Sequence, residues 1–111
     1  MNVSADVDVV TQETFDAEVL GADRPVLVKF TADWCGPCRQ LKPVLAALAT
    51  EEGDRLKVVE VDVDNNPEIT VRYGVLATPT LMVFQAGEPV KSLVGARPKR
   101  RLRQDLEDVL G

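Results

Sequence analysis

The chain has 111 residues, of which 45% are hydrophobic and 28% charged, and we expect residues 1–111 to form a single domain with its own core. The net charge of -5 argues against general binding to nucleic acid. No apolar stretch approaches the roughly 18 residues of a membrane span, so we expect no membrane partner either. The first residues lack the pattern of a secretory signal, which predicts a cytoplasmic location, where disulfides are mostly transient and catalytic.

The first third of the chain predicts a strand, a helix and a second strand. Residues 7–10 alternate only briefly between apolar and polar side chains, which favours a short strand. Thr11 is suited to cap the helix that follows, and the apolar positions of that helix are Phe15, Val19 and Leu20. Residues 21–25 predict a loop, and the mostly apolar run at 26–30 predicts a buried strand.

The middle of the chain predicts two helices with a strand between them. Apolar residues after Cys35 recur at the spacing of an amphipathic helix: Leu41, Val44, Leu45 and Leu48. Residues 56–63 alternate in part and predict a strand. Pro67 suits the first position of a short helix, which Gly74 ends.

The last third predicts a hairpin and a final helix. Residues 80–84 and 90–94 are strands joined by the turn at 85–88. Pro98 begins a helix whose apolar positions are Leu102, Leu106, Val109 and Leu110. The element order is therefore β-α-β-α-β-α-β-β-α, which predicts an α/β protein with a central mixed five-stranded sheet flanked by four helices.

The only two cysteines, Cys35 and Cys38, lie between the predicted strand at 26–30 and the long helix. A Cys-X-X-Cys motif in that position is a redox arrangement in an intracellular α/β protein. The alternatives are structural cysteines or half of a zinc site. Zinc usually takes four Cys or His ligands, and the chain has no histidine and no further cysteine. We therefore expect redox chemistry and no metal.

The position of each cysteine predicts its role. Cys35 falls at the N-terminus of the helix, where free N–H groups and the helix dipole stabilise a thiolate, so it is the expected nucleophile. Cys38 lies one turn deeper and is the expected resolving cysteine. Gly36 allows a partner backbone to approach closely, and Pro37 restricts the chain between the two sulfurs.

Over nearly its whole length the chain resembles the thioredoxin family. A bare Cys-X-X-Cys is weak evidence, but Trp-Cys-Gly-Pro-Cys followed about forty residues later by Thr-Pro-Thr and a β-hairpin is specific. The resemblance implies the thioredoxin fold, reduction of disulfides in substrate proteins, and recycling by a thioredoxin reductase. It also implies a monomer with no bound cofactor, to which NADPH contributes only through the reductase. The matching residues are Phe30, Ala32, 34–38, Pro43, Asp64, Asn66, Pro67, 73–75, 78–80, Phe84, Gly87 and Gly95.

The same resemblance implies a surface for docking substrates. Trp34 would form a wall beside the sulfurs, although a place in the core is the alternative. Pro79 would be cis, leaving the Thr78 backbone free to pair with an extended partner segment. Gly95 and Ala96 would complete a flat apolar patch, with a hinge before the last helix as the alternative.

The chain departs from the family's pattern at three positions, one of which is Thr31, where the family often has an aromatic residue. Many thioredoxins carry a buried Asp where this chain has Lys29, and a Lys where it has Glu60. We hypothesise that Lys29 and Glu60 pair beneath the cysteines and that Glu60 serves as the base when Cys38 attacks. The alternatives are an error in the register of the alignment, or an outward-facing Lys29 with no role.

Competing functions remain open at the level of sequence. An oxidant or isomerase would use the same fold, but Gly-Pro between the cysteines resembles the reducing members. A structural or regulatory binding subunit would use the docking surface without redox turnover. A reductase dedicated to one partner is a further alternative, because the acidic surface could select that partner electrostatically.

Overall fold

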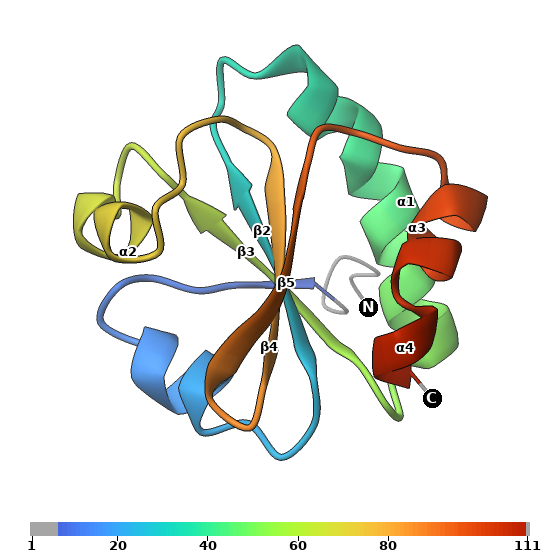
Figure 1. The fold of residues 1–111 in the computed structure, drawn as a ribbon. Helices are drawn as coiled ribbons and strands as arrows, with labels where there is room; N and C mark the ends of the chain where they lie inside the picture. Colours follow the sequence, from blue (N-terminus) through green and yellow to red (C-terminus); the bar gives the residue numbers. More distant parts are fainter. Residues whose placement is uncertain (1–6, 111) are drawn as a thin grey trace, which may run out of the picture.

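The computed structural model describes residues 7–110, which form a five-stranded mixed sheet with helices on both faces (Figure 1). The strands lie in the order β1-β3-β2-β4-β5. β1 and β2 both run parallel to β3, whereas β4 is antiparallel to β2 and β5. The predicted mixed α/β sheet is confirmed. The strands are β1 (Val7–Val9), β2 (Val26–Thr31), β3 (Lys57–Asp62), β4 (Thr80–Gln85) and β5 (Glu88–Val94).

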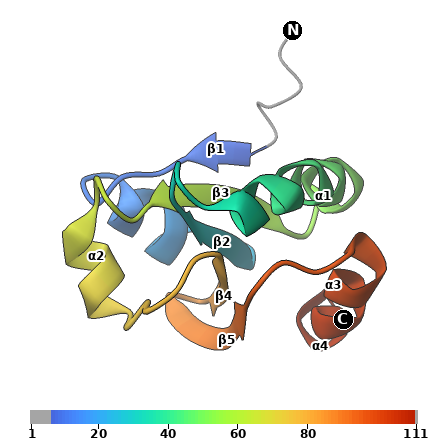
Figure 2. The same cartoon turned by 90° about the horizontal axis from the view of Figure 1, so that it is seen from above.

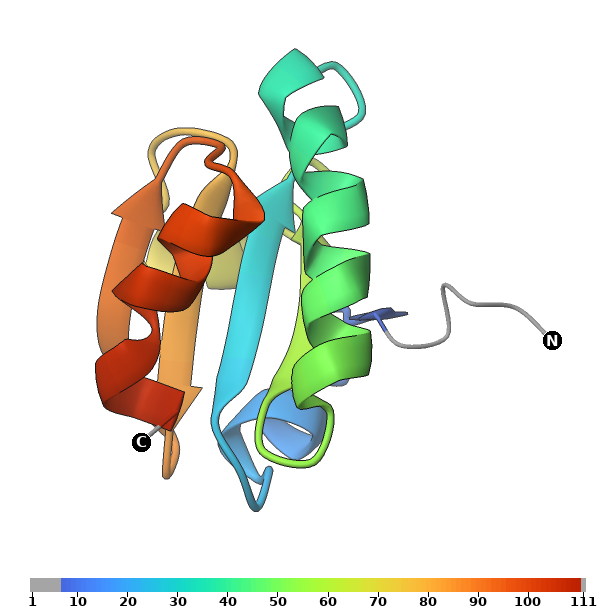
Figure 3. The ribbon, with the colours of Figure 1, turned by 90° about the vertical axis from the view of Figure 1, so that its right-hand side faces the viewer.

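The helical segments divide between the two faces of the sheet (Figure 2). The short π-type segment η2 and helix α2 lie on one face, and α1, α3 and α4 lie on the other, where Figure 3 shows α1 running along the sheet beside the two C-terminal helices. The segments are η2 (Asp16–Leu20), α1 (Gly36–Glu52), α2 (Pro67–Arg72), α3 (Lys99–Asp105) and α4 (Glu107–Leu110). Within residues 7–110, no helix is long and apolar enough to cross a membrane.

Strand alternation explains the two hydrophobic cores. Because successive side chains of a strand point to opposite faces, β2 places Val28 and Phe30 in the core under η2 and α2. It places Leu27 in the core under α1 and α3, together with Leu41 and Leu45 of α1. The same alternation directs Lys29, which lies two residues after Leu27, toward the α1 face.

Two predicted helices differ from those observed. Thr11 does not cap a helix, because the first helical segment has Phe15 at its N-cap. Thr11 lies in a local turn, where its N–H donates to the Thr14 hydroxyl at 3.0 Å and its carbonyl accepts from the Thr14 N–H at 3.1 Å. The first helical segment therefore begins only at Asp16, and it is the short segment η2. The C-terminal helix is likewise divided at Leu106 into α3 and α4, so the fourth predicted helix is two short ones.

Ion pairs fasten the end of α1 to α3. The buried Glu52 accepts hydrogen bonds from Arg55 at 2.7 Å and from Arg103 at 2.6 Å. Glu51 accepts from Lys99 at 2.5 Å and also from Arg103. These donors lower the pKa of both carboxyls, Lys99 acting most strongly on Glu51 and Arg55 on Glu52. Arg103 thus connects two carboxylates of α1 to the C-terminal helices.

Replacing Arg103 by Met should lower the melting temperature at about pH 7, because Glu52 keeps only Arg55 as a partner. Depressed carboxyl pKa values stabilise the fold above the unfolded value of 4.5, and that contribution is lost as the pH falls through the folded values. The deficit of Arg103→Met should therefore shrink in acid, as measured by thermal unfolding. Among residues 7–110 the exposed Arg100 forms no ion pair, so Arg100→Met serves as the control, and an undiminished deficit in acid would contradict the account.

Candidate active site

The turn between β2 and α1 sets the position of Cys35. The Cys35 N–H donates to the Ala32 carbonyl at 3.2 Å, and α1 begins at the next residue, Gly36. Cys35 has an extended backbone (φ -95°, ψ 108°), and its Sγ accepts the N–H of Cys38 at 3.2 Å. The sulfur therefore occupies the place of the side-chain oxygen that caps many helices. A thiolate at this position would receive the same N–H group and the positive end of the helix dipole.

The two cysteines are joined by a disulfide and lie almost out of contact with solvent. Their Cα atoms are 5.3 Å apart. Cys35 is 4% exposed and Cys38 is 2% exposed, and they pack with Ala32 and the partly buried Val63. Gly36 and Pro37 between them are exposed. The two residues between the cysteines are therefore at the surface, and neither has a side chain that can donate a hydrogen bond.

Trp34 lies on the surface beside this pair and is not part of the core. Its side chain is 68% exposed, and its indole N–H donates to the Asp64 carboxylate at 2.8 Å. Asp64 comes from the loop after β3, so a segment distant in sequence fixes the orientation of the indole. Sequence reasoning matched Asp64 to the family without finding this contact, because no local spacing connects residues 34 and 64.

The remaining predicted docking residues lie at the same edge of the sheet. The Thr78–Pro79 peptide bond is cis, as the family resemblance implies. The Pro79 carbonyl accepts the N–H of Gly95 at 2.9 Å, which connects the start of β4 to the end of β5, and Ala96 is exposed next to it. Gly95 has φ +99°, a conformation that favours glycine. Figure 1 shows both segments near the start of α1.

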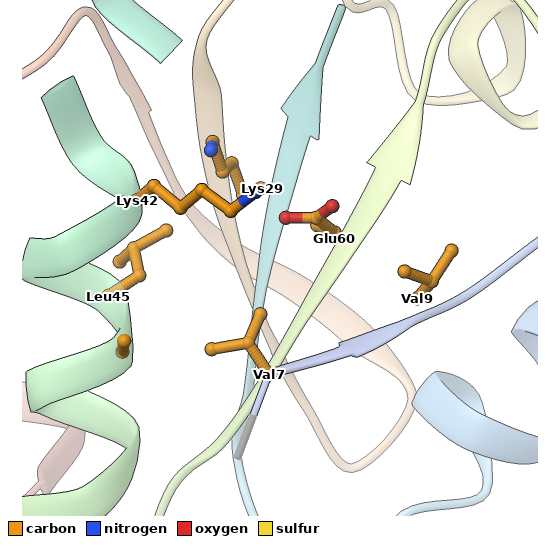
Figure 4. Close-up of a pocket in the computed structure, with 7 residues that line it drawn as sticks. Val7, Val9, Lys29, Lys42, Leu45 and Glu60 are labelled. Atoms are coloured by element: carbon orange, nitrogen blue, oxygen red, sulfur yellow. The ribbon is translucent and has the colours of Figure 1, made fainter. Parts of the chain in front are cut away.

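Two pockets between α1 and the sheet contain the charged residues of the site. The first is lined by Lys29, Lys42, Glu60 and apolar neighbours (Figure 4). The second shares these three residues and extends to Cys38, Arg39 and the turn at residues 31–33. Lys29 and Glu60 are register neighbours on β2 and β3. The resolving cysteine and the two residues of the hypothesised pair therefore line one pocket.

Lys29 is 3% exposed, so the alternative in which it faces outward is wrong. Burial lowers the pKa of its ammonium, the Glu60 carboxylate raises it, and the nearby Lys42 lowers it. Among the contacts of residues 7–110, no direct ion pair joins Lys29 to Glu60. The two groups therefore interact through the pocket and at a longer range than a salt bridge. Within these residues, no group of His, Cys, Asp or Glu side chains is arranged to hold a metal.

The thioredoxin family model matches residues 6–108. The chain therefore belongs to the thioredoxin family, whose members are thiol-disulfide oxidoreductases, and it is a protein-disulfide reductase with a redox-active Cys35–Cys38 pair. Members of this family carry no cofactor, and they act with a thioredoxin reductase.

Three relatives illustrate the similarity. A thioredoxin of Streptomyces clavuligerus is 52% identical over 84% of this chain and 86% of its own length. Thioredoxin 1 of a Nostoc species is 49% identical over 88% of this chain and 92% of its own length. The bifunctional thioredoxin reductase/thioredoxin of Mycobacterium leprae is 48% identical over 91% of this chain and 22% of its own length.

Replacing Lys29 by Met should stabilise the protein at about pH 7. Burial lowers the pKa of Lys29 from 10.5, so its charged form opposes folding at lower pH, and this cost fades as the pH rises toward 10.5. An apolar side chain of similar length removes this desolvation cost, so the free energy of unfolding should rise. Urea unfolding should show the gain shrink in alkali. The control is the exposed Arg100→Met, and a Lys29→Met protein less stable than the parent would refute the account.

Proposed function

We propose that Cys35 is the nucleophile and Cys38 the resolving thiol of this reductase. The Cys35 thiolate attacks one sulfur of a partner disulfide, forming a mixed disulfide and releasing the other partner sulfur as a thiolate. Cys38 then loses its proton and attacks Cys35, which forms the Cys35–Cys38 bond and releases the second partner thiolate. The single observation that carries this assignment is the Cys38 N–H donated to the Cys35 Sγ at the start of α1.

Seven residues near the disulfide would receive the partner; four of them are exposed, Thr78 and Gly95 are partly exposed, and Pro79 is buried. Trp34, held by Asp64, would stand beside the reacting sulfurs, and the Thr78 backbone would pair with an extended partner segment. The docking residues in this proposal are Trp34, Gly36, Pro37, Thr78, Pro79, Gly95 and Ala96. This choice of docking residues is supported by the fold, in which the start of α1, the loop before β4 and the end of β5 lie at one edge of the sheet (Figure 1).

Glu60 is the proposed base for the resolving step. It lines the pocket that reaches Cys38, and Lys29, its register partner on β2, lines the same pocket. Glu60 would accept the Cys38 proton directly or through a water, while Lys29 balances the charge of the carboxylate.

We further propose that residues 1–111 form a single domain that works as a cytoplasmic monomer. A thioredoxin reductase supplied with NADPH would return the oxidised form to the dithiol. The substrates would be disulfide-containing proteins, with a general range favoured over a single dedicated partner because the docking residues are mostly small and apolar.

The assignment of the two cysteines predicts opposite behaviour for two variants. Cys38→Ser should accumulate a stable mixed disulfide with an oxidised substrate protein, because no thiol can resolve it. Cys35→Ser should form none. Non-reducing electrophoresis with mass spectrometry measures the adducts. A Cys35→Ser, Cys38→Ser double variant that preserves cellular function would instead support a binding subunit without redox turnover.

Replacing Glu60 by Gln should slow the resolving step by about a hundredfold or more near neutral pH, the lower end of the range expected when a general base is lost. It should also lower stability, because Glu60 favours the charged form of the buried Lys29. Single-turnover release of the partner thiol and urea unfolding measure the two effects. Glu88→Gln, on the exposed edge strand β5, is the matched control. Resolution as fast as in the parent across neutral pH would rule out Glu60 as the base.

A further inference from the structure

Lys42 lies on α1 one turn after Cys38, so the two side chains share a face of the helix. It lines both pockets, together with Lys29 and Glu60. Figure 4 shows Lys42 extending from α1 toward the sheet, where the side chains of Lys29 and Glu60 lie. The helix therefore contributes a second ammonium to the space beneath the resolving cysteine.

The charged groups around this space come from every element that borders it. β2 contributes Lys29, β3 contributes Glu60, and α1 contributes Lys42 and Arg39. Asp33 comes from the turn, and its carbonyl accepts a hydrogen bond from Arg39 at 3.1 Å. Lys42 also lowers the pKa of Lys29, so the two ammonium groups act on each other across the pocket.

We propose that Lys42 is a positioning residue for the resolving step, in which its ammonium and that of Lys29 together stabilise the one negative charge that moves between Glu60 and Cys38. This inference rests on the proposed role of Glu60. When the proton passes from the Cys38 Sγ to the Glu60 carboxylate, the negative charge moves from the carboxylate to the sulfur. The total charge of the pocket does not change, and both lysines face the charge before and after the transfer.

The resolving step needs positive charge near Cys38 while its thiolate exists. A thiolate in a nearly closed site is poorly solvated, and nearby cations favour it over the thiol. Burial opposes the charged form of Lys29, so a second ammonium nearby adds to the stabilisation that Lys29 can give to the thiolate. Lys42 is exposed at its position on α1, so it keeps its hydration while its ammonium reaches the pocket.

The test separates the two cysteines in one stopped-flow trace. Reduced protein is mixed with excess dithionitrobenzoate, an aromatic disulfide whose thiolate product is coloured. The first phase of colour reports attack by Cys35, and the second reports resolution by Cys38. The variants are Lys42→Met, Lys42→Arg and Glu60→Gln, with the exposed Arg100→Met as the control for net charge. Each is measured as a function of pH after thermal unfolding has verified its fold.

Lys42→Met should slow the second phase near neutral pH by about three- to tenfold and move its pH midpoint upward, as expected when a cation near a thiol is removed. Lys42→Arg should restore the parent rate, and the first phase should not change. The inference is overturned if Lys42→Met matches the parent at every pH, or if Lys42→Arg is as slow as Lys42→Met. Glu60→Gln tests the base independently, because a slow Glu60→Gln with a normal Lys42→Met would reject only the role of Lys42.

Discussion

The hydrogen bond between the Cys35 sulfur and one N–H group in the first turn of α1 is the interaction on which the rest of the site depends. The Cys38 N–H donates to the Cys35 Sγ at 3.2 Å, so the sulfur caps the helix. The geometry requires β2 to end, the turn to close on Ala32 and the helix to start within a few residues. The redox function therefore depends on where one strand stops and one helix begins.

The sheet topology brings the rest of the site to this junction. β2 is the central strand, parallel to β3 on one side and antiparallel to β4 on the other. The ends of β2, β3 and β5 and the start of β4 therefore meet at one edge. This is why Asp64 can hold Trp34, and why the Gly95 N–H can bind the Pro79 carbonyl.

Residue spacing predicted the individual strands and helices of this arrangement. It could not predict contacts between residues that are far apart in the sequence. Alternation and helical periodicity gave the five strands and α1, and the motif placed Cys35 at a helix start, because those signals lie within a few residues of one another. The Trp34–Asp64 hydrogen bond depends on how two loops meet in space. The break at Leu106 also escaped prediction, because the apolar spacing of the last helix continues through it.

Lys29 departs from a local rule of strand sequences. A charged residue within a buried apolar strand is costly, and the burial of Lys29 accordingly lowers the pKa of its ammonium. The sequence hypothesis paired Lys29 with Glu60, and the structure places them as register neighbours on β2 and β3. The contacts of residues 7–110 include no salt bridge between them. Both side chains instead line a pocket that Lys42 also lines. The spacing of Cys38 and Lys42, one helical turn apart, was the sequence signal that could have identified this third residue.

The measurement that tests the central claim most directly is the pH titration of the Cys35 thiolate in the reduced protein, followed by its ultraviolet absorbance and by its rate of alkylation. If the helix start stabilises the sulfur, Cys35 should titrate clearly below the value of about 8.5 for a free cysteine, and it should be alkylated before Cys38. A Cys35 thiol that titrates at or above that value, or that reacts no faster than Cys38, would contradict the account.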